Sequence, residues 1–189
     1  MNLKALITKN RSYRRFFEDI QIERSQLEEW VDLARLSPSA KNLQHFKYHL
    51  SYTTEACDQI FPNTAWAGYL KDWPGPEKGE RPSAYITVLL DKTISSNPWH
   101  DEYISAQSIL LGAVEAGFGG CILAAINKRE LSKEFQLAEH FEIMYCIALG
   151  KPKEEVIVED VEDDSIIYYR DANQVHHVPK RKLSELIIN

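Results

Sequence analysis

One segment, residues 104–116, constrains the fold more than any other because it is apolar on nearly every side of a predicted helix. Ala106, Ile109 and Ala113 recur at helical spacing, and Gly117 follows at a position where helices commonly end. A helix without a polar face must be covered on all sides. We therefore expect this helix at the centre of the core or at a contact between subunits.

Strands are predicted on both sides of this helix. Residues 84–90 and 143–149 are continuous apolar runs that indicate buried strands, whereas residues 46–50 alternate apolar and polar side chains as a half-buried strand does. Residues 121–125 form a small apolar strand or turn after the glycine-rich residues 117–120. Several helices around an interrupted sheet make the predicted fold class α+β.

Three further helices are predicted from their capping residues. They are residues 3–9 behind Asn2, a helix from Ser25 to the residue before Pro38, and residues 128–137 behind Asn127. In the second helix, Ser25 and Glu28 have the spacing of a capping box, in which each side chain satisfies a free backbone N–H of the first turn. Pro38 ends this helix because the residue before proline is pushed out of the helical region.

The length of 189 residues fits a single domain, residues 1–189. Within it, residues 61–82 are too rich in tryptophan for a linker and too broken by proline and glycine for one long element, so we expect an ordered, lid-like insertion. Residues 151–189 are predicted as a C-terminal extension that is acidic through Asp164, β-rich through Tyr169 and basic at residues 180–182.

Charge and hydropathy exclude several functions. The net charge of −6 argues against a nucleic-acid partner. No apolar run approaches membrane-spanning length and no apolar signal core stands at the N-terminus, so we expect a cytoplasmic protein with no membrane partner. Cys57, Cys121 and Cys146 are odd in number and widely spaced, which favours buried free thiols.

The first candidate site is the basic turn at residues 11–14. Arg11, Ser12 and Arg14 concentrate guanidinium groups and a hydroxyl just after the first predicted helix. Arginine presents a planar fork of donors to phosphate oxygens, so the cluster suits a phosphate. The alternative is a solvated basic turn, which is the usual role of a charge run.

The second candidate site follows the helix that Pro38 ends. It combines small residues with two carboxamides, which can donate to and accept from the edge of a flat heteroaromatic ring. Its residues are Pro38, Ser39, Ala40, Asn42 and Gln44. The alternative is a plain helix stop followed by a polar loop.

Together, the two segments resemble the N-terminal signatures of the FMN-dependent nitroreductase family, and the resemblance extends from Leu3 to about Pro152. It implies a central, mostly antiparallel sheet flanked by helices in an intertwined homodimer. It also implies non-covalent FMN, NAD(P)H as co-substrate, and a small planar acceptor such as a nitroaromatic or a quinone. Hydride would pass from NAD(P)H through the flavin to the acceptor in ping-pong turnover.

The same resemblance implies the roles of individual residues. Arg11 and Ser12 would bind the phosphate and ribityl chain, and Arg14 would face the flavin ring and support it electrostatically. The loop carrying Ser39, Asn42 and Gln44 would serve the site of the neighbouring subunit. Further cofactor contacts are implied for the backbone near Leu123 and Ala124, beside flavin N5, and for Lys180 and Arg181 (with Lys182 adjacent), at the phosphate. No protein side chain is expected to be a catalytic residue, since the flavin carries the chemistry.

Two alternatives to a nitroreductase remain open from the sequence. One is another flavin enzyme of the same fold, such as a dehalogenase or a dehydrogenase, and the other is a non-catalytic flavin-binding protein. A metal site at His176 and His177 is not expected, because adjacent residues on a strand point to opposite faces. The aromatic residues available to stack a planar acceptor are Trp66, Tyr69, Trp73 and Trp99, for which core packing is an equal alternative.

Overall fold

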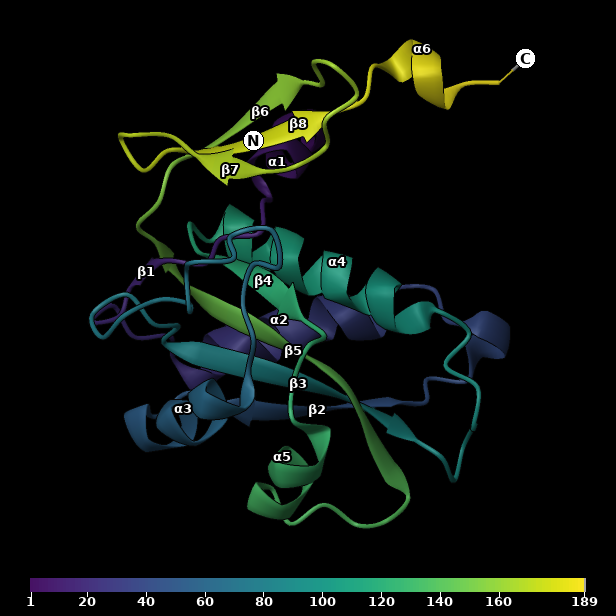
Figure 1. Ribbon diagram of the computed structural model, residues 1–189. Coiled ribbons are helices and arrows are strands. Elements are labelled where there is room, and N and C mark those ends of the chain that lie inside the picture. The colour runs from purple at the N-terminus through teal and green to yellow at the C-terminus, as the bar shows by residue number, and fades with distance from the viewer. Residues whose placement is uncertain (189) are drawn as a thin grey trace.

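The computed structural model describes residues 1–188 and confirms the α+β class (Figure 1). Its main sheet runs in the order β1 (Phe16–Phe17), β5 (Phe141–Pro152), β3 (Ala84–Asp91), β2 (Phe46–Ser51), and β4 (Gly119–Leu123) also pairs with β5. Every pairing in this sheet is antiparallel. The strand β5 is therefore the element around which the sheet is organised, since it pairs with three others.

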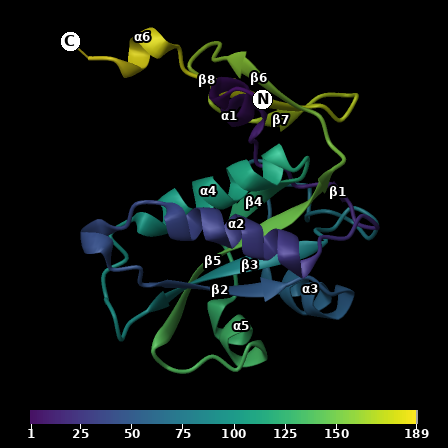
Figure 2. The same cartoon turned by 180° about the vertical axis from the view of Figure 1, so that it is seen from behind.

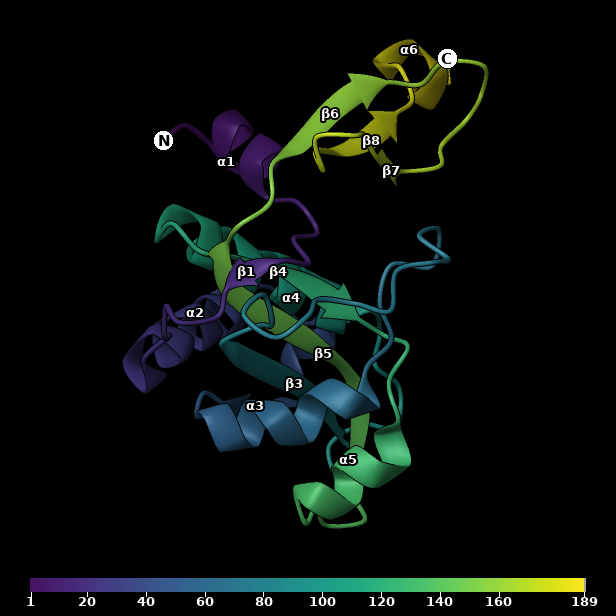
Figure 3. The same cartoon turned by 60° about the vertical axis from the view of Figure 1, so that its left-hand side comes forward.

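Helices cover both faces of the main sheet (Figures 2 and 3). The helices α2 (Arg24–Leu36) and α4 (Asp101–Glu115) lie on one face, and α3 (Thr54–Ile60) and α5 (Lys128–Glu134) lie on the other. Two short 3-10 turns, η1 (Ala40–Asn42) and η2 (Phe61–Asn63), follow α2 and α3. None of the helices in the described part of the chain is long and apolar enough to cross a membrane.

Strand β3 is apolar on both sides because each side meets a different core. Ile86 and Val88 pack toward α2 and α4, whereas Tyr85 and Leu89 pack toward α3 and α5. The register of β3 against β5 shifts between Val88 and Leu89. A strand covered on two faces carries a continuous apolar run rather than an alternating one, which is the pattern that predicted it.

The apolar helix α4 is covered on one side and open on another. Ala106, Ile109 and Ala113 are fully buried in the core, as expected. Tyr103 and Ile104, near the start of the helix, are 52% and 44% exposed. The helix therefore has apolar surface beyond what the core of a single chain covers.

The C-terminal extension forms a second sheet that stands beside α1 (Leu3–Lys9) in Figure 3. Its strands are β6 (Val156–Asp160), β8 (His176–Lys180) and β7 (Tyr169–Arg170), in that order, and α6 (Leu183–Leu186) follows. The pairing of β6 with β8 is parallel and that of β7 with β8 is antiparallel. The prediction of β structure for residues 165–169 is wrong except at Tyr169, because residues 165–168 follow a turn with left-handed backbone at Asp163 and Asp164 and do not pair with a strand.

Some predicted boundaries are confirmed and others are corrected. The Asn2 and Asn127 side chains cap α1 and α5 as expected, and Gly117 has the positive φ of a residue that ends a helix. The capping box of α2 is formed by Glu23 and Gln26 instead of the predicted pair, Ser25 and Glu28. Glu28 accepts a hydrogen bond from Arg24 at 2.7 Å and is not available to the first turn.

Two further boundaries differ from the predictions. Helix α5 ends at Glu134, three residues early, because Gln136 adopts left-handed backbone at φ +50°. The strand predicted at residues 121–125 begins at Gly119 and ends at Leu123. Gly120 fits in this strand because glycine has no Cβ. A Cβ at this position would collide with the carbonyl oxygen of Ala148 on β5.

Candidate functional site

The N-terminal segment and the C-terminal extension meet at a cleft of about 340 Å³. Ser12 forms a bridge with Gly120, and the Tyr13 N–H donates to the Gly120 carbonyl at 3.1 Å, so residues 11–14 run along β4. The opposite wall comes from β8. The cleft therefore brings together Arg11, Ser12 and Arg14, which were predicted as a cluster, with Lys180, which lies more than 160 positions along the chain.

The cleft has cationic side chains from Arg11, Arg14 and Lys180 and lacks a counter-charge. None of the described residues that line it is Asp or Glu. Arg11 donates through Nη2 to the Ile7 carbonyl at 2.8 Å, and Arg14 through Nη1 to the Ser12 carbonyl at 3.2 Å. The Nε atoms of both arginines are buried and have no hydrogen-bond partner among residues 1–188. Buried donors without partners indicate a ligand that supplies acceptors, and an anionic phosphate such as that of FMN fits them.

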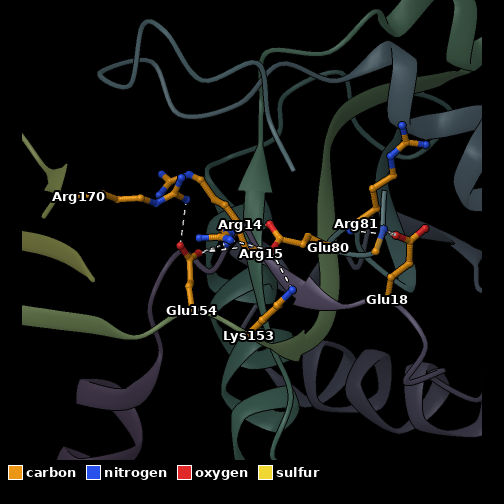
Figure 4. Close-up of polar contacts among 9 residues, drawn as sticks. Arg14, Arg15, Glu18, Glu80, Arg81, Lys153, Glu154 and Arg170 are labelled. Atoms are coloured by element: carbon orange, nitrogen blue, oxygen red, sulfur yellow. Dashed lines mark hydrogen bonds and ion pairs between the residues drawn. The ribbon is translucent and has the colours of Figure 1, made fainter. Parts of the chain in front are cut away.

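Glu154 holds the backbone of the segment that carries Arg14 and Arg15 (Figure 4). Its side chain is 1% exposed and accepts the backbone N–H groups of Arg14 and Arg15, the latter at 3.3 Å. It also pairs with Arg170 of β7 at 3.0 Å. One buried carboxylate thus joins the N-terminal segment to the extension. Sequence reasoning missed Glu154 because it stands in an acidic run that is typical of solvent-exposed surface.

Arg15 belongs to the scaffold and not to the cleft. Its Nε and Nη2 donate to the two carboxylate oxygens of Glu80 at 2.5 and 2.7 Å, and Lys153 Nζ lies 2.9 Å from the same group. The hydrogen bonds from Arg15, followed by those from Lys153, lower the pKa of Glu80 to about 2. This ion-pair network ties the segment before β1 to the end of residues 61–82 (Figure 4).

The second predicted motif lines a different cavity, of about 360 Å³. Pro38, Ser39 and Gln44 lie there with Asp101, which begins α4. No described residue lines both this cavity and the cleft. Within one chain, the two motifs therefore do not come together.

Asp101 holds the conformation of the loop at residues 38–44. Its Oδ2 accepts the Ser39 hydroxyl at 2.8 Å and the Ala40 N–H at 2.6 Å. Asn42 and Gln44 adopt left-handed backbone, at φ +54° and +50°. Such conformations cost free energy in non-glycine residues and persist where neighbouring contacts impose them. Sequence reasoning missed Asp101 because its partners lie about 60 positions away.

Leu123 and Ala124, the residues expected near flavin N5, are not among the described residues that line the cleft. Leu123 is 4% exposed and packs in the core with α3 and α5, and Ala124 follows the end of β4. The residues of β4 that line the cleft are Gly120, Cys121 and Ile122. The part of β4 that lines the cleft therefore precedes Leu123 and Ala124, whose contact with flavin N5 stays a prediction.

The late basic residues separate in the structure. Lys180 lines the cleft. Arg181 instead pairs with Asp164 at 3.2 Å and with Glu185 at 3.5 Å, and Lys182 precedes α6. Only Lys180 of the three is in position to meet a ligand in the cleft of this chain.

Of the four aromatic residues predicted to stack a planar acceptor, the three tryptophans are engaged elsewhere, and the Tyr69 ring centroid lies 4.9 Å from that of Tyr168. Trp66 donates through Nε1 to Thr64, Trp73 lies 4.2 Å from the Arg170 guanidinium, and Trp99 lies 4.9 Å from Lys41 Nζ. None of these tryptophans lines the cleft. The aromatic residue that does is Tyr168, whose ring centroid lies 5.0 Å from the Arg14 guanidinium. It was missed because nothing local in residues 165–169 indicates that the chain returns to the N-terminal segment.

The two adjacent histidines of β8 face opposite sides, as expected for a strand. His177 bonds Glu159 at 2.8 Å, which raises its pKa. His176 is 1% exposed and lines the cleft. Burial, then the positive charges of Arg14 and Arg170, lower the pKa of His176 to about 4, so that it is neutral at neutral pH.

Comparison with known proteins gives a consistent result at the level of sequence. The model of the family described as "Nitroreductase family" matches residues 7–151. The Bacillus subtilis (strain 168) protein named "Putative NAD(P)H nitroreductase YodC" is 23% identical over 170 residues, which cover 74% of this chain and 84% of that protein.

Solved structures share the fold. An FMN-dependent nitroreductase from Clostridium difficile R20291 is similar at a TM-score of 0.65 and 21% identity, with 86% of this chain and 92% of that chain covered. A protein from Exiguobacterium sibiricum 255-15, crystallised in complex with FMN, is similar at a TM-score of 0.67 and 14% identity, with 81% and 89% covered. The main sheet and its helices are therefore the arrangement found in these proteins.

Proposed function

The chain belongs to the nitroreductase family, and from this premise we propose that it is an NAD(P)H-dependent oxidoreductase with non-covalently bound FMN. The acceptor would be a small planar, electron-poor compound such as a quinone or a nitroaromatic. The observation that carries the proposal is the cleft itself, where the buried Nε atoms of Arg11 and Arg14 lack partners among residues 1–188. FMN, when bound, supplies the hydride chemistry.

The residues of the cleft have distinct roles in this proposal. Arg11, Ser12 and Lys180 would bind the terminal phosphate and ribityl chain with charge-assisted hydrogen bonds. Arg14 would face the ring and stabilise the negative charge that develops there on reduction. Glu154 and Tyr168 would fix Arg14, because one accepts its backbone N–H and the other packs against its guanidinium.

We propose further that the flavin site is completed by a second copy of the chain in a homodimer. This is supported by the motif at residues 38–44, which lies at a cavity that shares no lining residue with the cleft of its own chain. The exposed Tyr103 and Ile104 of α4 supply apolar surface for such a contact. In the dimer, Asn42 and Gln44 of one subunit would contact the flavin held by the cleft of the other.

The decisive experiment is the visible spectrum of the purified protein with identification of the released chromophore. We expect a yellow protein that releases FMN and not FAD, because the cleft suits one terminal phosphate. Steady-state oxidation of NADH and NADPH should then depend on a quinone, with parallel double-reciprocal plots. A colourless protein that takes up no FMN on reconstitution would contradict the proposal, and a yellow protein that oxidises neither nucleotide would make it a flavin-binding protein instead.

A further inference from the structure

His176 is a buried side chain of the cleft that the assignment above leaves without a role. Its Nε2 lies 3.5 Å from Arg14 Nη1, and its ring lies 5.3 Å from the Tyr168 ring. It is carried by β8, in the extension, whereas Arg14 comes from the N-terminal segment. The contact therefore joins the two walls of the cleft.

The contact with Arg14 fixes where the proton of the imidazole sits. A guanidinium has only donors, so Nε2 must be the acceptor and the single proton of the neutral ring is on Nδ1. The Nδ1 atom is buried and has no hydrogen-bond partner among residues 1–188. A buried N–H without a partner calls for an acceptor from outside the chain.

We propose that His176 positions Arg14 through Nε2 and is itself a neutral hydrogen-bond donor, through Nδ1–H, to the ring of a flavin in the cleft. The donor part of this inference rests on the proposed function, and the pairing with Arg14 does not. A ring edge is the matching ligand because His176 contacts Arg14, the residue assigned to the ring. The neutral state also matters, since it adds a donor without adding a further positive charge beside Arg14 and Arg170.

The binding test uses two ligands that differ only at the phosphate, FMN and riboflavin. His176→Phe keeps a ring but removes both hydrogen-bonding atoms, so the Kd of both ligands should rise by the same factor, about tenfold. His176→Gln should stay within about threefold of the natural protein, because its carboxamide can both accept from Arg14 and donate.

The control is His177→Phe, at the neighbouring position on the opposite side of β8, where the ring stacks on Tyr169. It should leave both Kd values unchanged. If His176→Phe weakens FMN alone, His176 acts on the phosphate and the ring assignment is overturned. Unchanged affinity for both ligands overturns the donor role altogether.

A second measurement needs no flavin and no substitution that risks the fold. Nitrogen-15 NMR of the histidine-labelled natural protein should show His176 as the Nδ1–H tautomer with a pKa well below 6.5. The charged or titratable groups that act on the His176 ring are Arg14, Arg170 and His177. Arg14→Met should raise that pKa. The Nε2–H tautomer, or a pKa that Arg14→Met leaves unchanged, would reject the pairing. If the natural protein binds neither flavin, the proposed function and the donor role fail together, and this spectrum still decides the pairing.

Discussion

The Asp101 carboxylate accepts a hydrogen bond from the Ser39 hydroxyl at 2.8 Å across 62 positions of the chain. The same oxygen accepts the N–H of Ala40. The first residue of the apolar helix therefore determines the shape of the loop at residues 38–44. If the proposed homodimer forms, that shape governs how the loop meets the flavin of the neighbouring subunit.

Asp101→Ala should lower the free energy of unfolding by about 2–3 kcal/mol, because it removes the charged acceptor of two hydrogen bonds. It should also weaken FMN binding, since the left-handed backbone of the loop loses its anchor. Urea denaturation and FMN titration measure the two effects. Asp101→Asn, which retains an acceptor oxygen, is the matched control. Equal stability of Asp101→Ala and the natural protein would show that the loop holds its own shape.

Glu80→Gln should destabilise the protein in a pH-dependent manner. Arg15 depresses the folded-state pKa of Glu80 to about 2, below the usual value of 4.5. The stabilisation is therefore fully present above pH 4.5 and is lost as the pH falls toward 2. At neutral pH the substitution should cost about 2–3 kcal/mol. Urea melts from pH 7 to pH 2.5 should show the difference from the natural protein shrinking; a difference that is constant with pH would contradict the assignment.

Glu154→Ala should destabilise the protein strongly, by about 3–5 kcal/mol, because it leaves Arg170 buried without a counter-charge. Arg170→Met removes the other partner, and also its contact with Trp73. The double variant should lose less stability than the sum of the single variants. Urea denaturation of all four proteins gives the coupling energy. Additive losses would mean that the buried pair does not join the extension to the body.

Arg14→Met should make the bound flavin harder to reduce while FMN remains bound. A hydrogen bond to a charged group is worth about 1.5–3 kcal/mol, and about 30 mV corresponds to roughly 1.4 kcal/mol for a two-electron couple. The midpoint potential should therefore fall by about 30–65 mV. Arg11→Met, in contrast, should weaken FMN retention and change the potential little. Spectroelectrochemical titration of protein fully loaded with FMN measures the midpoint potential. An unchanged potential in Arg14→Met would mean that Arg14 does not contact the flavin ring.

Two variants that each weaken the flavin site should restore each other if the site is shared between subunits. Arg14→Met and Asn42→Ala damage opposite contributions to one flavin site. A hybrid dimer of the two carries one site with both residues intact. Co-refolding a mixture should therefore recover activity above that of either variant alone. A mixture of Arg14→Met with Arg11→Met is the control, since no intact cleft can form in it. No recovery in the first mixture would place both motifs in the site of the same chain.

The parts of the fold that depend on local pattern could be predicted from the sequence. Strand β3 was found because a strand covered on both faces is apolar throughout. Arg11, Ser12 and Arg14 were found together because they are nearly contiguous. The capping box of α2 was misplaced because Glu23 with Gln26 and Ser25 with Glu28 have the same spacing, and the choice depends on a side-chain bond between Arg24 and Glu28.

The parts of the site that come from distant segments could not be predicted. Tyr168 and His176 reach the cleft only because β8 pairs with β6 in parallel and turns the extension back toward the first residues. Glu154 carries no local signal of burial, since its partners are the backbone of Arg14 and a side chain of β7. In each case the information lies in the pairing of segments and not in the composition of either one.

The cleft takes one wall from residues 11–14 and the other from residues 168–180. A ribosome adds roughly 5–20 residues per second, so residues 168–180 are synthesised on the order of ten to thirty seconds after residues 11–14. A nascent chain that has not passed Lys180 has the strands of the main sheet but an open side where the ligand would lie. If FMN binds in this cleft as proposed, it can bind only after residues 168–180 have been synthesised, and a prematurely terminated chain would be distinguished from a finished one by its lack of colour.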